Sequence, residues 1–194
     1  MLTAAHDDDR IVFPLSYEYA RLAHVPISLD NSHVIHRALK KCGINLVSAM
    51  PETWLVPLIR MIEDDHEMTL LRLAREEEGV GISAGAHLAG VRSAILLQNH
   101  GFLASINGVV SLALLYKIPL LLLVSYRGYF GDKDPWQAQG GIVTEPMLRS
   151  LGIPYEVVNE PGQVDRSIRD AITWTESSLH PMALLFTRQL MWED

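Results

Sequence analysis

The sequence predicts an α/β protein with a doubly wound, mostly parallel six-stranded sheet that carries helices on both faces. Six short apolar segments alternate with segments in which apolar residues recur at helical spacing. Several of the short segments are continuous aliphatic runs, as at 120–125, which is typical of strands buried on both faces. This regular alternation of strand and helix favours a parallel sheet between two layers of helices.

The first helix is expected to begin at Asn31 or Ser32, either of which can cap it, and to end at Gly43. Pro51 then marks the turn between the first strand and the second helix. Strands are expected at 45–49, 68–73, 94–98, 120–125, 155–158 and 182–187. Helices are expected at 53–64, 77–89, 103–116, 144–151 and 163–178, with a long polar loop over 126–142.

The chain divides into an N-terminal arm, residues 1–30, and one domain, residues 31–194. The arm has no clear period and contains two prolines, which indicates irregular structure. Its apolar residues predict that it packs on its own domain or on a neighbour; they are Ile11, Val12, Phe13, Tyr17 and Tyr19.

Composition excludes several classes of protein. The net charge is −7 and no basic stripe offsets it, so a nucleic-acid partner is not expected. The most apolar stretch, 109–124, contains Lys117 and Pro119 and is too short to span a membrane. The single cysteine, Cys42, cannot form an internal disulfide, which suits a reducing cytoplasm.

Function is expected at the carboxyl ends of the strands, where ligands bind to open α/β sheets. Residues 75–86 carry three consecutive glutamates followed by a glycine-rich helix, and residues 97–107 carry a dense polar cluster. Each segment alone also has a structural explanation. Acidic residues stabilise a helix N-terminus, and polar residues commonly form turns.

Taken together, the two segments resemble the pyrimidine-binding domain of thiamine diphosphate enzymes. The order is a strand, REEEGVGISAGAHLAG, a strand, LQNHGFLASIN, a strand and SYRG. The pattern is similar to the α subunit of sulfopyruvate decarboxylase and to the matching part of phosphonopyruvate decarboxylase. In these relatives the catalytic glutamate lies nine residues before a glycine of the helix, here Gly85, which implies Glu76.

The resemblance implies a chemical role for Glu76. A carboxyl group hydrogen-bonded to ring nitrogen N1′ promotes the imino tautomer through which thiamine diphosphate loses its C2 proton. Asn99 and Gly101 are the further candidate cofactor-binding residues. Thr53, His100 and Arg127 lie in turns at the carboxyl ends of strands and are the candidate substrate residues. Arg127 can also simply pair with an acid such as Asp132.

The resemblance further implies a partner chain. Related enzymes hold the diphosphate and Mg²⁺ through a Gly-Asp-Gly segment followed by an asparagine, and this sequence contains no such segment. Gly131-Asp132-Lys133 is the nearest approach, and no metal ligands are assigned to this chain. The expected assembly is a hetero-oligomer in which a separate diphosphate-binding subunit supplies the Gly-Asp-Gly…Asn motif and the metal ligands.

The expected activity is decarboxylation of a 2-oxo acid to an aldehyde and carbon dioxide. The resemblance favours 3-sulfopyruvate, with 3-phosphonopyruvate as the close alternative. His100 replaces a serine that is usual in the relatives, and Phe102-Leu103-Ala104 replaces a smaller run, so the pocket can differ in shape. The alternatives are a non-catalytic structural or regulatory subunit and, less favoured because phosphate loops are absent, a nucleotide-binding flavodoxin-like domain.

Overall fold

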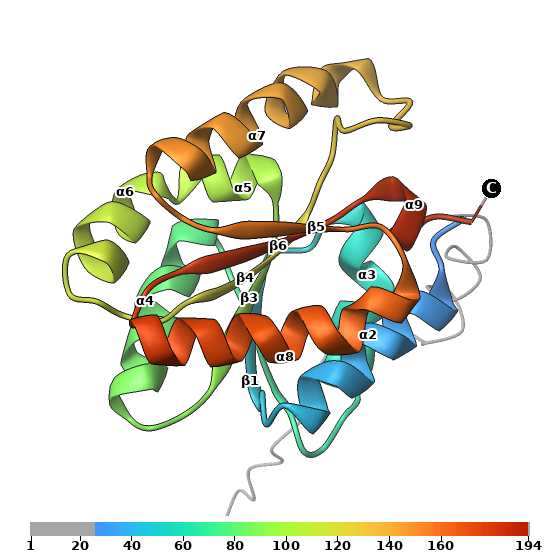
Figure 1. Cartoon of the computed structure of the whole chain (residues 1–194). Helices are drawn as coiled ribbons and strands as arrows, with labels where there is room; N and C mark the ends of the chain where they lie inside the picture. Colours follow the sequence, from blue (N-terminus) through green and yellow to red (C-terminus); the bar gives the residue numbers. More distant parts are fainter. Residues whose placement is uncertain (1–25, 194) are drawn as a thin grey trace, which may run out of the picture.

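Six parallel strands form the central layer of the computed structural model, which describes residues 26–193 (Figure 1). The strands are β1 (Leu46–Ala49), β2 (Thr69–Arg72), β3 (Ser93–Gln98), β4 (Leu121–Ser125), β5 (Tyr155–Val158) and β6 (Met182–Phe186). Their order across the sheet is β2-β1-β3-β4-β6-β5. The fold class predicted from the sequence is therefore confirmed, and all five strand pairs are parallel.

Helices cover both faces of this sheet, as Figure 1 shows. One face carries α2 (Leu29–Lys41), α3 (Val56–Glu63), α8 (Pro161–Ser178) and α9 (Arg188–Met191). The other carries α4 (Glu76–Leu88), α5 (Asn99–Ala104), α6 (Ile106–Gly108), the π-helical segment η2 (Val109–Leu114) and α7 (Ala138–Ser150). Two 3₁₀ turns, η1 (Thr53–Leu55) and η3 (Pro135–Gln137), lie in connecting loops.

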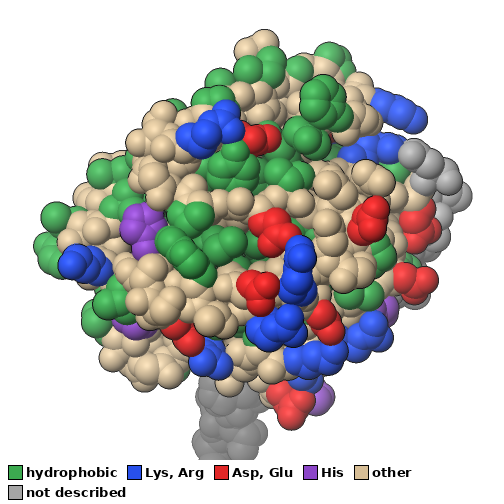
Figure 2. All heavy atoms as spheres, in the orientation of Figure 1, with side chains coloured by type: hydrophobic (Ala, Val, Ile, Leu, Met, Phe, Trp, Pro, Cys, Tyr) green, Lys and Arg blue, Asp and Glu red, His purple; other side chains and the backbone are tan. Residues whose placement is uncertain are grey.

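Successive side chains of each strand point to opposite faces of the sheet, which produces one hydrophobic core on each face. In β4, Leu121 and Leu123 pack in the core beneath α2, α3 and α8, whereas Leu122 and Val124 pack beneath α4 and α7. All four side chains are at most 3% exposed. Figure 2 shows that charged side chains gather over α8 and α2. No described helix is both long and apolar enough to cross a membrane.

Three boundaries predicted from the sequence were wrong. Helix α2 is capped by Ser28 and not by Asn31 or Ser32, because the Ser28 hydroxyl accepts a hydrogen bond from the Asn31 N–H (3.3 Å). The helical run expected at 103–116 begins at Asn99, so Asn99 and His100 start a helix directly after Gln98 ends β3. The loop expected over 126–142 is shorter, because η3 and α7 occupy 135–150.

The apolar residues of the N-terminal arm, at positions 11–19, lie outside the described residues. The segment just after them joins the domain. Ile27 is buried and forms an antiparallel bridge with Trp192, and the Ser28 N–H donates to the Met191 carbonyl (2.9 Å). The two ends of the described chain therefore lie side by side.

The strand order reverses its direction between the paired strands β1 and β3. From β1 the chain moves to β2 at one edge, and it then returns to β3 on the other side of β1. Such reversals open ligand sites at the carboxyl ends of the strands. Helix α4 packs on both β1 and β3, so its first residue, Glu76, lies at this position.

Candidate active site at the carboxyl ends of β1, β3 and β4

Three consecutive glutamates begin α4, and the structure gives each of them a different position. The Glu78 carboxylate accepts hydrogen bonds from the N–H groups of Ala74 (3.0 Å) and Arg75 (3.3 Å), which closes a capping box. Glu77 forms an exposed ion pair with Arg75 (3.2 Å). Glu78 thus stabilises the helix start and Glu77 pairs with Arg75, whereas Glu76 is the carboxyl that contacts Gly101 in the neighbouring helix α5.

Glu76 lies against Gly101 in the first turn of α5. An ideal Cβ on Gly101 would be 2.6 Å from Glu76 Cγ and 2.8 Å from Oε1, so only glycine leaves room for this carboxyl. Gly101 is buried and Glu76 is half-buried. The site therefore contains a partly dehydrated carboxyl group held between α4 and α5.

Asn99 joins the site to two neighbouring segments. Its side chain is fully buried, and its amide nitrogen donates to the Arg127 carbonyl (2.8 Å) and to the Thr144 hydroxyl (3.1 Å). Its Oδ1 atom makes no hydrogen bond within residues 26–193. A buried acceptor without a partner costs about 1–3 kcal/mol, so a donor from a ligand would be favoured here.

The candidate substrate residues occupy three different environments. Thr53 is exposed at the start of η1. His100 is also exposed, and its ring lies against Gly140 of α7, where an ideal Cβ would be 2.2 Å from the ring Cε1 atom. Arg127, in contrast, is only 6% exposed. The structure therefore places His100 beside Gly101 in α5 with its ring against α7, and it buries Arg127 at the start of the loop that follows β4.

Arg127 is engaged by carboxylates on every side. Its Nε donates to Asp132 (3.0 Å), one terminal nitrogen donates to Glu52 (3.0 Å) and the other donates to Asp134. Its guanidinium also lies 4.5 Å from the centre of the Trp54 ring. The pairing with Asp132 considered from the sequence is thus confirmed, whereas binding of a substrate anion by Arg127 stays a prediction.

Burial and pairing shift the ionisation of this cluster. Burial would lower the pKa of Arg127, but hydrogen bonds and charges from Asp132 and Glu52 raise it above its ordinary value. Burial also opposes ionisation of Asp132, yet hydrogen bonds from the Gly128 N–H and Arg127 lower its pKa. For Glu52, burial dominates and raises the pKa. Arg127 is therefore a permanent cation in this cluster, and its ion pairs connect the loop after β4 to the turn after β1.

Sequence reasoning missed Glu52 and Gly140. Glu52 follows Pro51 in a turn at the carboxyl end of β1 and accepts from the Trp54 N–H (3.0 Å), a capping position that the sequence can signal. Gly140 belongs to a glycine doublet within a region expected to be loop. Its contact with His100 depends on α7 crossing α5, which no local pattern reveals.

A cavity of about 640 Å³ lies elsewhere, at the amino ends of the strands, and is lined by Arg92, His87 and Glu176 among others. The Arg92 guanidinium there is bonded to Glu176 through two nitrogens. This cavity contains none of the candidate residues. Within the described part of the chain, no group of three or more His, Cys, Asp or Glu side chains is placed to hold a metal ion.

Comparisons with known proteins identify the family. Residues 30–140 match the family described as "Thiamine pyrophosphate enzyme, N-terminal TPP binding domain". The α subunit of sulfopyruvate decarboxylase from Methanocaldococcus jannaschii is 37% identical over 165 residues, which is 85% of this chain and 97% of the relative. The corresponding α subunit from Methanococcus maripaludis is 33% identical over 165 residues, 85% of this chain and 98% of the relative.

More distant relatives share part of the chain. Phosphonopyruvate decarboxylase from Streptomyces viridochromogenes is 32% identical over 117 residues, which is 60% of this chain but 30% of that protein. A solved structure of 2-oxoglutarate:ferredoxin oxidoreductase from Magnetococcus marinus superposes with a TM-score of 0.64 at 17% identity, over 87% of this chain and 30% of that one. This last likeness supports the fold alone. The family match and the two α subunits go further: the chain belongs to the thiamine pyrophosphate enzymes, as a member of their N-terminal TPP-binding domain family.

Proposed function

We propose that this chain is the pyrimidine-binding subunit of a thiamine-diphosphate-dependent 2-oxo acid decarboxylase. The observation that carries the proposal is the position of Glu76, whose carboxyl lies half-buried against Gly101 where the strand order reverses between β1 and β3. Of the neighbouring glutamates, Glu78 caps the start of α4 and Glu77 forms an ion pair with Arg75. The names of the relatives, sulfopyruvate and phosphonopyruvate decarboxylases, support the reaction class.

The residues present suit the aminopyrimidine ring of the cofactor. Bound thiamine diphosphate supplies the electron sink for decarboxylation. Glu76 holds and moves a proton at ring nitrogen N1′, where a positioned carboxyl group acts as a general acid and base. Asn99 offers the buried Oδ1 acceptor that has no partner among residues 26–193, and Gly101 borders the Glu76 carboxyl.

The diphosphate and its Mg²⁺ belong, in this proposal, to a partner subunit with the Gly-Asp-Gly…Asn motif. The nearest sequence in this chain, Gly131-Asp132-Lys133, is unsuited to metal binding because the Asp132 carboxylate is bonded to Arg127 and to the Gly128 N–H (2.8 Å). The names of the relatives, subunit alpha, support a second chain.

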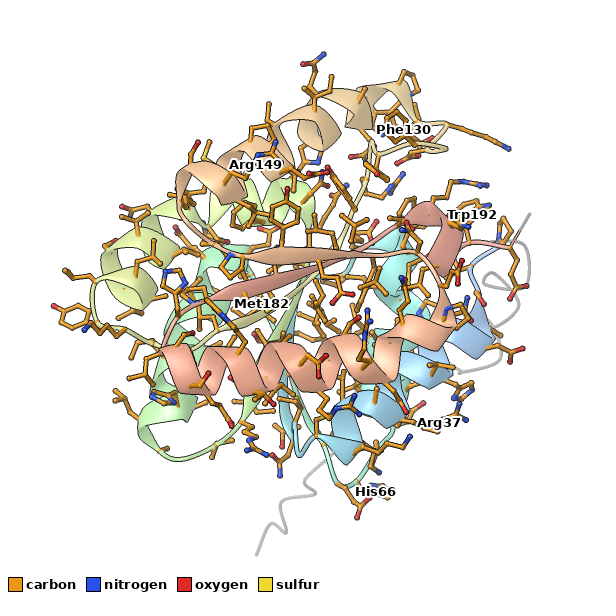
Figure 3. All side chains as sticks on the ribbon, in the orientation of Figure 1. Arg37, His66, Phe130, Arg149, Met182 and Trp192 are labelled. Carbon is orange, nitrogen blue, oxygen red and sulfur yellow. The ribbon has the colours of Figure 1, made fainter. Side chains whose placement is uncertain are left out.

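Open surface along α4 and exposed aromatic side chains on the loop after β4 support docking of this partner in a hetero-oligomer. Gly81 and Gly85 lie on the outer side of α4 with open space around them, and Leu88 on the same helix is 79% exposed. On the loop after β4, Phe130 is 87% exposed and Trp136 is 71% exposed, so neither anchors the loop to its own domain. Figure 3 shows Phe130 on the outer side of the molecule, near the start of α7.

The proposed substrate is a 2-oxo acid with a second anionic group. We favour 3-sulfopyruvate, with 3-phosphonopyruvate as the alternative. The proposed location of the enzyme is the cytoplasm. His100 and Thr53 are exposed and follow the carboxyl ends of β3 and β1, whereas Arg127 is held by three carboxylates. Protonated imidazole donates charge-assisted hydrogen bonds to sulfonate or phosphonate oxygens.

His100→Ala is expected to raise the KM for 3-sulfopyruvate or 3-phosphonopyruvate by more than the KM for pyruvate. Loss of one charge-assisted hydrogen bond costs about 1.5–3 kcal/mol, which corresponds to a KM change of about 10- to 150-fold. The measurement is steady-state decarboxylation by the reconstituted complex, with His87→Ala at the distant cavity as the matched control. Equal changes for all three substrates would mean that His100 does not bind the distal anion.

The proposed function itself is tested by mixing the purified chain with a candidate diphosphate-binding subunit, thiamine diphosphate and Mg²⁺. We expect cofactor-dependent release of carbon dioxide from the mixture, but no turnover and negligible cofactor binding by this chain alone. Turnover by the isolated chain would contradict the division of the site between two polypeptides. A complex that assembles but turns over none of the three 2-oxo acids would favour a non-catalytic subunit.

A further inference from the structure

Gly101 is packed too closely against Glu76 for any side chain to fit. An ideal Cβ would lie 2.6 Å from Glu76 Cγ, 2.8 Å from Oε1 and 2.9 Å from Cδ. Non-bonded carbon atoms normally approach to about 3.5–4.0 Å. Gly101 is not among the described glycines with a positive φ, so the backbone conformation does not require glycine here. The missing side chain therefore provides space and not conformational freedom.

We propose that Gly101 is a positioning residue for the reaction. Because Gly101 has no side chain, the Glu76 carboxyl can occupy the space where a side chain at position 101 would lie. This inference rests on the proposed function of Glu76. It assigns Gly101 an action through Glu76, distinct from direct contact with the cofactor.

The backbone on either side of Gly101 is held in place, so α5 cannot easily move away from α4. The Ser105 hydroxyl donates to the Gly101 carbonyl (2.7 Å). Asn99, two residues earlier, is bonded to the loop after β4 and to α7, and Phe102 is fully buried in the core. A Cβ added at position 101 must therefore displace the end of the Glu76 side chain, which is the more mobile partner in this contact.

Gly101→Ala tests the inference in the reconstituted complex. Displacement of a reacting group by about 1 Å can cost about 10²-fold, so deuterium exchange at cofactor C2 is expected to fall by that order. The Kd for thiamine diphosphate is expected to rise no more than it does in Glu76→Gln. A fall in exchange that is matched by an equal loss of cofactor affinity would overturn the inference, because Gly101 would then contact the cofactor itself.

Gly108→Ala is the matched control on the same helical run. An ideal Cβ at Gly108 would lie 3.6 Å from Val80 Cβ, an ordinary contact with the same helix α4. Exchange is expected to stay close to that of the wild type in this variant. A similar loss in Gly108→Ala and Gly101→Ala would overturn the inference, since any added methyl group between α4 and α5–α6 would then have the same effect.

A second readout needs no cofactor. Alanine is a better helix former than glycine, so Gly101→Ala is expected to raise the Tm of the chain when Glu76→Ala has emptied the space. In the wild-type background the rise is expected to be smaller or reversed, because the Glu76 side chain must move. Equal shifts in both backgrounds would show that positions 76 and 101 are not coupled, and would overturn the proposal.

Failure of the inference can be told apart from failure of the proposed function. Near-normal exchange in Glu76→Gln would contradict the role of Glu76 itself. Slow exchange in Glu76→Gln together with near-normal exchange in Gly101→Ala would leave that role intact and overturn only the positioning role of Gly101.

Discussion

Glu76→Gln is expected to fold, assemble with its partner subunit and still bind cofactor, while decarboxylation falls by about 10²- to 10⁴-fold. Glutamine keeps nearly the same shape, so it fits the space beside Gly101, but it cannot exchange a proton with a ring nitrogen. The expected loss is therefore in kcat and not in assembly. Steady-state release of carbon dioxide by the reconstituted complex measures it.

Glu77→Gln and Glu78→Gln are the controls that the sequence itself provides. Glu77 forms an exposed ion pair with Arg75, and pairs of this kind contribute about 0–1 kcal/mol. Glu78→Gln keeps a side-chain oxygen that can accept from the Ala74 and Arg75 N–H groups. Both variants are expected to stay within about tenfold of the wild type. A larger loss in Glu77→Gln than in Glu76→Gln would show that the catalytic glutamate is misassigned.

Arg127→Met is expected to destabilise the chain by about 3–5 kcal/mol, because it leaves two buried carboxylates without their cation. The side chains of Arg127, Glu52 and Asp132 are 7%, 7% and 5% exposed, so water cannot replace the lost charge. The free energy of unfolding of the isolated chain, from urea denaturation, measures the effect.

Arg166→Met serves as the control for this substitution. Arg166 pairs with Glu156 (2.8 Å) but is 59% exposed, so a change of less than about 1 kcal/mol is expected. The comparison also separates the two functions considered for Arg127. A stable Arg127→Met chain whose complex has a raised KM for the anionic 2-oxo acids would identify Arg127 as a substrate residue and contradict the structural role.

Strand and helix positions were largely predictable because their signals are local. The strand expected at 155–158 is found there, and the helix expected at 163–178 begins only two residues earlier. The helical run that starts at Asn99 was misplaced because asparagine and histidine are frequent in turns. Residue type alone favours a turn at these positions, whereas the buried hydrogen bonds of Asn99 to Arg127 and Thr144 hold the start of α5 in place.

The candidate site was predictable only in part, for a different reason. Position 76 was singled out through a resemblance, and the structure separates it from positions 77 and 78 by hydrogen bonds that lie within one helical turn. Arg127 and Glu52, which form an ion pair, are 75 residues apart in the sequence. The close contacts of Gly101 with Glu76 and of Gly140 with His100 arise only when helices pack. Contacts of this kind leave no periodic signal in the chain.

Deuterium exchange at C2 of thiamine diphosphate, in the reconstituted complex without any 2-oxo acid, measures whether Glu76 activates the cofactor. It reports activation of the cofactor independently of substrate binding and product release. We expect rapid exchange in the wild-type complex and exchange slowed by about 10²- to 10⁴-fold in the Glu76→Gln complex, at unchanged subunit assembly. Equal exchange rates in the two complexes would contradict the assignment of Glu76 as the residue that activates the cofactor.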